Sequence, residues 1–169
     1  MKITYNPPRP SVNYEIKLQA ARELLKNSPK LRPDTDDEAA FNRAADDLAM
    51  CGNEYWDGYE LAKHLEYHAG WDITSDIVEE LEDYHIYIDR FLLCEEKKWA
   101  EEHQIQPPFP IGSRVRVPYG FERVTATITA LYEYEPARYL VKRDEQPEDD
   151  TFRSIIKFED AELLEEGQS

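Results

Sequence analysis

The segment "AEEHQIQPPFPIGSRVRV", Ala100–Val117, is where the hydrophobic pattern of the chain changes. Before it, apolar residues recur every three or four positions, which is the spacing of one face of an α-helix. After it, Val115 and Val117 alternate with Arg114 and Arg116, a period of two that is typical of a strand with one buried face. The prolines between the two patterns cannot continue a helix. The sequence therefore predicts a helical part followed by a sheet.

Helical periodicity extends from Asn13 to the end of this first part. The predicted helices begin after Asn13, at the capping pair Thr35 and Glu38, at Asp57 and at Thr74 or Ser75. The third is predicted to end at Gly70 and to use Tyr59, Leu61, Ala62, Leu65 and Tyr67 as its apolar residues. The last, Asp76–His103, is predicted to be one uninterrupted helix of about 29 residues.

Strand periodicity covers the remainder of the chain. Val124, Ala126, Ile128 and Ala130 alternate with threonines, and "RYLVKR" (138–143) and "FRSIIKF" (152–158) follow. Four or five short strands in about 55 residues predict a small antiparallel barrel. The predicted fold class is α+β, with a helical bundle over residues 11–105, a barrel over 109–166 and "QPPFP" (106–110) as the linker.

The stretches "IGSRVRVPYG", "VTATITALYEYEPARYLVKR" and "SIIKFEDAELLEE" together resemble the SH3-like small barrels of the KOW and Tudor-like type. Those barrels have a GxxVxV first strand, a long curved second strand, a YxV third strand and a final strand that runs into a short acidic turn. The resemblance covers roughly the last third of the chain. It implies an architecture whose members bind peptides, RNA or DNA, and it does not select among them.

Negative charge is concentrated in the middle of the chain. Residues 34–106 hold 21 acidic and five basic residues, a net charge of −16 that equals the charge of the whole protein. The first 33 residues carry +5 and the last 63 carry −5. This charge repels nucleic acids and anionic lipids, so neither is an expected direct ligand.

The acidic residues form rows on the predicted helices. Acids at a helix start complement the helix dipole, and this explanation stays open. The surplus continues beyond the first turns, however, and rows of carboxylates about 5–6 Å apart can imitate the phosphates of a nucleic acid. The candidate partner-binding residues on these rows are Asp36, Asp37, Asp46, Asp47, Asp76, Glu79, Glu80 and Asp83, of which the last four are predicted to share one helix face.

These rows lead to the main functional hypothesis. The chain is similar in kind to acidic phage-encoded anti-restriction and anti-CRISPR proteins, and that resemblance implies a non-enzymatic inhibitor. Its partner would be a basic nucleic-acid-binding protein or complex in the host cytoplasm. The alternative is an adaptor that binds a peptide or nucleic acid through the barrel, with Tyr119 and Phe121, on either side of Gly120, as exposed contact residues. Core packing is the other explanation for the aromatic residues of the barrel.

No pattern indicates catalysis or a cofactor. The sequence has no glycine-rich phosphate loop and no serine or cysteine in a nucleophile motif. His64 and His68 have a spacing that can chelate zinc, but nothing nominates a third ligand, so we expect packed or surface histidines. Cys51 and Cys94 are expected to be small buried residues. With no secretory segment and no apolar run of about 18 residues, we expect a cytoplasmic protein.

Overall fold

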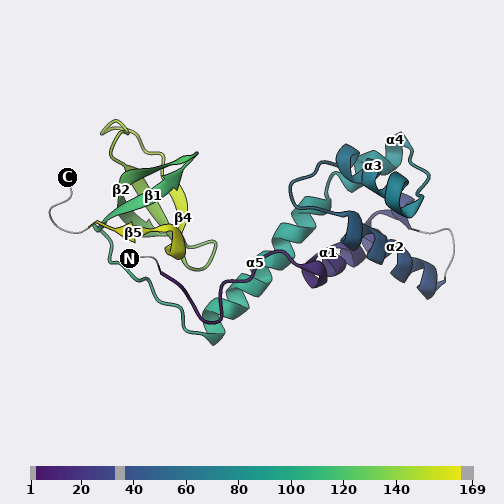
Figure 1. Cartoon of the computed structure of the whole chain (residues 1–169), viewed down its shortest axis with the longest axis horizontal. Coiled ribbons are helices and arrows are strands. Elements are labelled where there is room, and N and C mark those ends of the chain that lie inside the picture. Colours follow the sequence, from purple (N-terminus) through teal and green to yellow (C-terminus); the bar gives the residue numbers. More distant parts are fainter. Residues whose placement is uncertain (1–2, 33–36, 165–169) are drawn as a thin grey trace. The chain divides into compact units, whose positions relative to one another are not determined.

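The computed structural model describes residues 3–32 and 37–164, and the chain forms two compact units (Figure 1). We call residues 10–95 the helical unit, and residues 1–9 together with 96–169 the sheet unit. The combination of helices and an antiparallel sheet confirms the α+β class. The domain ranges 11–105 and 109–166 stay predictions, because compactness alone does not show which segment folds by itself.

The helical unit contains short helices with capped N-termini. Its elements are α1 (Tyr14–Asn27), η1 (Pro29–Leu31), α2 (Glu38–Cys51), α3 (Gly58–Ala69), α4 (Ser75–Leu81) and the first residues of α5 (Tyr84–Glu102). Asn13, Asp57 and Thr74 cap α1, α3 and α4, as predicted. The cap of α2 is Asp37, whose side chain accepts the N–H of Ala39 at 3.0 Å, whereas Thr35 lies outside the described residues.

The prediction of one helix over Asp76–His103 was wrong, because the chain turns between α4 and α5. The N-terminus of α3 lies against the end of α4, and Gly58 donates its N–H to a carboxylate oxygen of Glu82 at 2.7 Å. A Cβ at Gly58 would collide with the carbonyl oxygen of Val78. The turn itself contains no proline or glycine, so the helical periodicity of the sequence continues through it unchanged.

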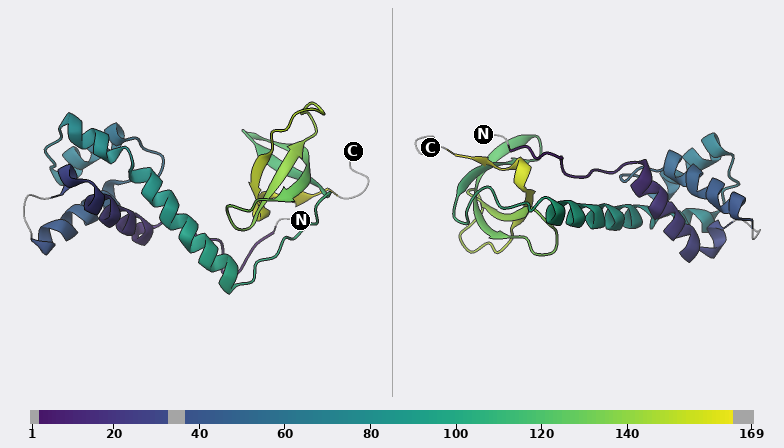
Figure 2. Two further views of the ribbon diagram at one scale, coloured as in Figure 1. Left: turned by 180° about the vertical axis from the view of Figure 1, so that it is seen from behind. Right: turned by 90° about the horizontal axis from the view of Figure 1, so that it is seen from below.

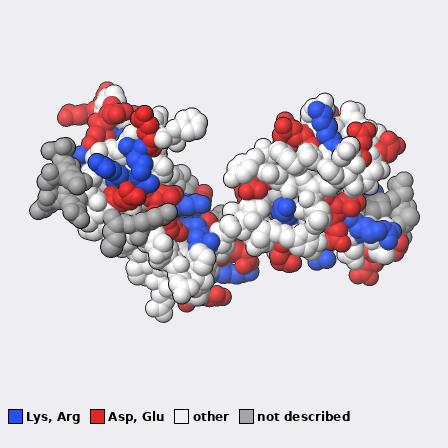
Figure 3. Space-filling view, in the orientation of Figure 1, with Lys and Arg blue, Asp and Glu red and all other residues white. Residues whose placement is uncertain are grey.

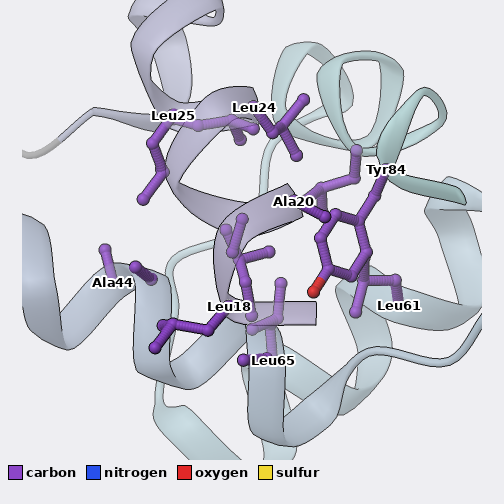
Figure 4. Packing of buried hydrophobic residues seen from close by; sticks show 14 of the residues in the cluster. Leu18, Ala20, Leu24, Leu25, Ala44, Leu61, Leu65 and Tyr84 are labelled. Atoms are coloured by element: carbon purple, nitrogen blue, oxygen red, sulfur yellow. The ribbon is translucent and has the colours of Figure 1, made fainter. Parts of the chain in front are cut away.

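The core of the helical unit is built from the inward faces of its helices (Figure 4). Tyr84, the first residue of α5, enters this cluster and donates its hydroxyl to the carbonyl oxygen of Lys17 at 2.8 Å. Burial raises the pKa of the Tyr84 hydroxyl. The labelled side chains in Figure 4 are Leu18, Ala20, Leu24, Leu25, Ala44, Leu61, Leu65 and Tyr84.

The sheet unit is built on a five-stranded antiparallel sheet of order β4-β3-β2-β1-β5 (Figure 2). Its elements are β1 (Arg114–Tyr119), β2 (Glu122–Leu131), β3 (Arg138–Arg143), β4 (Ser154–Lys157), η2 (Phe158–Asp160) and β5 (Glu162–Leu163). The predicted alternation is confirmed in β1 and β2, where Val115, Val117, Ala126 and Ile128 are buried. The described pairing leaves β4 and β5 as the two edges.

One residue of the segment predicted as a linker, Phe109, belongs to the core of the sheet unit. Phe109 is buried, and its N–H donates to the hydroxyl oxygen of Tyr139 at 2.8 Å. The same hydroxyl donates to the carbonyl oxygen of Phe109 at 2.9 Å. One tyrosine thus satisfies both backbone groups of Phe109, which holds "QPPFP" against the sheet.

A buried group of charged residues, which we call the ionic cluster, joins distant segments of the sheet unit. It consists of Arg9, Glu96, Arg138 and Glu159. Glu96 is only 1% exposed and lies 2.7 Å from Arg138 Nη1 and 3.5 Å from Arg9 Nη1. The guanidinium of Arg9 also donates to Glu159 at 2.9 Å.

Trp99 completes the attachment of the N-terminal segment to the end of α5. Its indole N–H donates to the carbonyl oxygen of Pro7 at 3.0 Å, and the Arg9 guanidinium lies 5.0 Å from the centre of its ring. Tyr5 packs edge-on against the same ring. Residues 3–9 are therefore an integral part of the sheet unit.

Glu96→Ala should lower the free energy of unfolding by about 3–5 kcal/mol, because it leaves two buried guanidinium groups without a shared carboxylate. Denaturant unfolding followed by circular dichroism measures this loss. Glu101→Ala, an exposed carboxylate in the same helix, is the matched control and should change stability by less than about 0.5 kcal/mol. Equal stabilities of the two variants would show that the ionic cluster does not hold the segment.

Candidate interaction surfaces

Some of the predicted acidic residues in and before α2 make contacts within the fold, and some are exposed to solvent. Asp37 caps the helix, and Asp46 is exposed but accepts a hydrogen bond from the Tyr14 hydroxyl at 2.8 Å. Asp47 is half-buried and accepts the indole N–H of Trp71 at 2.9 Å. Asp36 lies outside the described residues. At least Asp47 therefore stabilises the fold, whatever else this helix contacts.

The four acids predicted to share one helix face do not all lie on one helix. Asp76, Glu79 and Glu80 belong to α4, whereas Asp83 lies in the turn that follows it. The turn interrupts the regular row because α4 ends at Leu81.

A base from the first 33 residues partly neutralises this row. Lys30 in η1 lies 3.1 Å from the Asp76 carboxylate. The hydrogen bond to Asp76, with smaller effects of the charges of Glu80 and Glu79, raises the pKa of Lys30. Lys30, one of the basic residues of the first 33, thus offsets part of the negative charge of α4.

The helical unit retains a large acidic surplus despite these contacts. Residues 10–95 contain 20 acidic and eight basic residues. Figure 3 shows the acidic side chains in several groups on the visible face of this unit, with basic side chains between them. The surface is therefore acidic on average, but it carries separate acidic groups on that face instead of one continuous row.

The hairpin between β1 and β2 presents two aromatic side chains, as predicted. Gly120 has a φ of +60°, which permits the tight turn, and Phe121 at its tip is fully exposed. Tyr119 is 52% exposed, and the Arg143 guanidinium lies 3.8 Å from the centre of its ring. Arg143 Nε is buried and has no hydrogen-bond partner among the described residues.

The outward side of α3 carries the most aromatic surface of the helical unit. Tyr59 and Tyr67, which we counted among the apolar residues of the predicted helix, are 57% and 84% exposed. Leu61, Ala62 and Leu65 define the buried side of the helix, and residues at positions 59, 63 and 67 fall on the opposite side. We use the name α3 aromatic face for the rings on and beside this side of the helix. Tyr59 and Tyr67 lie on it, Trp56, His64 and His68 form a stack on its flank, and Tyr55 precedes the helix.

The two histidines of this face stack on each other. Their ring centres are 5.5 Å apart with nearly parallel planes, and Trp56 stacks on His64 at 4.0 Å. Within ranges 3–32 and 37–164, no group of three His, Cys, Asp or Glu side chains could hold a metal ion. Ring stacking thus holds these side chains together.

Both cysteines differ from the prediction in their exposure. Cys51 is half-buried and Cys94 is exposed. Burial, and to a lesser degree the charge of Asp47, raises the pKa of the Cys51 thiol, which disfavours the reactive thiolate. None of the helices in the described part of the chain is long and apolar enough to cross a membrane.

Comparison of the chain with protein-family models finds no match. Comparisons with curated proteins and with solved structures find none either.

Asp47→Ala should lower the free energy of unfolding by about 1–3 kcal/mol, because the half-buried Trp71 N–H loses a charged acceptor. Glu79→Ala removes an exposed carboxylate and should change stability by less than about 0.5 kcal/mol. Chemical denaturation of both variants distinguishes an acid that stabilises the fold from one that is available to a partner. Similar losses in both would contradict this distinction.

Proposed function

We propose that this protein is a non-enzymatic binding protein whose acidic helical unit occupies a basic nucleic-acid-binding surface of a partner. The observation that carries the proposal is the surplus of 20 acidic over eight basic residues in residues 10–95. Much of the affinity of such partners for nucleic acid comes from neutralisation of phosphates by Lys and Arg. Exposed carboxylates on packed helices present comparable negative charges to the same side chains.

The exposed acids at the α4–α5 turn are the strongest contact candidates. Glu79 and Asp83 are exposed and Glu80 is half-exposed, and among the described residues their side chains neither cap a helix nor form an ion pair. An inhibitor of this kind competes with the nucleic acid for a host complex, as the resemblance to phage-encoded anti-restriction and anti-CRISPR proteins implies. It needs no cofactor and acts where the complex acts, in the host cytoplasm.

A second candidate function is favoured by the exposed hairpin. Here the sheet is an SH3-like barrel and the protein an adaptor that binds a peptide or nucleic acid through Tyr119 and Phe121. A ten-residue β2 with a register shift between Ile128 and Ala130 supports a curved second strand, and η2, which directly follows β4, supports a strand that runs into a short acidic turn. A fully exposed Phe121 contributes nothing to the core, so contact with a partner is a reason for its presence.

Charge reversal tests the first function. The triple variant Glu79→Lys, Glu80→Lys, Asp83→Lys should lose the partner that the tagged wild-type protein retains from host lysate at low salt. In the wild type, that partner should be released by high salt and displaced by added DNA or RNA, because phosphates and carboxylates compete for the same Lys and Arg side chains. Mass spectrometry of the retained proteins measures the loss.

The matched control is the triple variant Glu145→Lys, Glu148→Lys, Asp149→Lys, which changes net charge equally but lies in the loop between β3 and β4. It should still retain the partner. Loss of the partner in both triple variants would show that net charge alone, and not the acids of α4 and the following turn, determines binding. A partner that nucleic acid cannot displace would contradict the proposal.

The adaptor function predicts a different result. Replacing Tyr119 and Phe121 by Ala should then abolish retention of a salt-resistant partner without unfolding the protein, since both side chains are largely exposed. Tyr134→Ala, which removes another exposed aromatic ring of the sheet unit, is the control. Thermal unfolding by circular dichroism shows that the variants are folded, and undiminished retention by the double variant rules this function out.

A further inference from the structure

The α3 aromatic face is an ordered surface. Trp56, His64 and His68 form a stack of three nearly parallel rings, with interplanar angles of 17° and 16°. Tyr67 meets the outer ring of this stack edge-on, at 4.8 Å from the centre of His68. Contacts between neighbouring rings limit their rotation, so a ligand that contacts the exposed rings of this surface orders them at little further cost in conformational entropy.

One cation already occupies a ring of this face. The Lys63 ammonium lies 4.2 Å from the centre of the Tyr59 ring, within the range of a cation–π interaction. The adjacent tyrosines Tyr55 and Tyr67 are both 84% exposed, and neither has a cation over its ring in the described structure. The chain thus shows which type of ligand this surface attracts and leaves further rings free for it.

The charges around the rings favour a cationic ligand as well. Glu60 and Glu66 are exposed on α3 itself, and Asp57 caps its N-terminus. Lys63 is the only basic residue between positions 44 and 89, apart from the histidines. A cation on the α3 aromatic face therefore meets aromatic faces and carboxylates together, whereas a phosphate meets repulsion.

We propose that the α3 aromatic face binds arginine side chains of a basic partner segment, by stacking of guanidinium groups on the exposed rings and pairing with the adjacent carboxylates. This inference rests on the proposed function in that it places part of the same basic partner on α3. It adds a chemical selectivity that a surface acting by charge alone lacks.

The geometry favours arginine over the other cations and over other occupants. A guanidinium is planar and weakly hydrated, so it stacks on a ring and pairs with a carboxylate at once, whereas an ammonium is a strongly hydrated point charge. Nucleic acid bases could stack on the same rings, but their phosphates would face Asp57, Glu60 and Glu66. A second copy of this face would set the same acids against each other.

Two synthetic peptides test the proposal with the full-length protein. One is a ten-residue peptide of alternating arginine and serine, and the other has lysine in place of every arginine. NMR titration at low salt, followed at the Trp56 indole and the rings of His64 and His68, measures the dissociation constants. We expect the arginine peptide to bind about three- to tenfold more tightly than the lysine peptide.

Ring variants separate stacking from charge. Tyr59→Ala with Tyr67→Ala should weaken arginine-peptide binding about tenfold and remove the preference for arginine. Tyr59→Phe with Tyr67→Phe keeps the rings and should bind like the wild type. Lys63→Gln frees the Tyr59 ring and should strengthen binding several-fold. Because both tyrosines are largely exposed, these changes spare the core.

The proposal is overturned if both peptides bind equally, or if loss of the rings leaves binding unchanged. Preferential binding of a single-stranded DNA oligonucleotide at these resonances, or shifts that depend on protein concentration alone, would also overturn it by identifying a different occupant.

The variant Glu79→Lys, Glu80→Lys, Asp83→Lys keeps the α3 rings. If it loses the lysate partner but keeps the arginine preference, the two proposals stand separately. If the lysate partner is not displaced by nucleic acid while the peptide preference persists, only the proposed function fails.

Discussion

The sheet unit depends on the ion pairs that the Glu96 carboxylate makes with Arg9 and Arg138. This carboxylate is almost completely buried, and it lies within ion-pair distance of Arg9 from the N-terminal segment and Arg138 at the start of β3. Removing a charge from water costs several kcal/mol, which only well-placed partners offset. The carboxylate links the three segments, because its displacement would remove a carboxylate that Arg9 and Arg138 share. The first residues of the chain thus become part of a unit whose sheet begins more than 100 positions later.

The helical unit meets a different constraint, the mutual repulsion of its carboxylates. Part of this repulsion is offset locally, as Lys30 pairs with Asp76 and Trp71 donates to Asp47. Other acids, including Glu79 and Asp83, remain exposed. The distinction matters for function, because an acid that a tertiary contact uses is held in place, whereas an exposed acid is free to contact a partner. Composition alone cannot separate the two classes.

The two proposed modes of recognition are compatible physically. Exposed carboxylates provide long-range attraction for a basic surface, which mainly raises the association rate. Aromatic rings such as Tyr67 act only at contact distance, where they discriminate a planar guanidinium from an ammonium. An acidic protein with an ordered aromatic face can therefore attract a basic partner and also select within it.

Local sequence patterns determined most of the secondary structure. Capping by Asn13, Asp57 and Thr74 and the alternation in β1 and β2 depend on neighbouring residues, so the sequence contains the information needed to find them. The exposure of Tyr119 and Phe121 beside Gly120 was predictable for the same reason, since a tight hairpin turn lies at the surface.

Only the tertiary structure decided the features that depend on contacts between distant residues. The break between α4 and α5 arises from Gly58 and Glu82, and the burial of Glu96 arises from Arg9 and Arg138. The outward position of Tyr59 and Tyr67 was open in the sequence because aromatic residues fit either side of an amphipathic helix. Packing of Leu61 and Leu65 into the core settled it, since turning these leucines inward turns the tyrosines toward solvent.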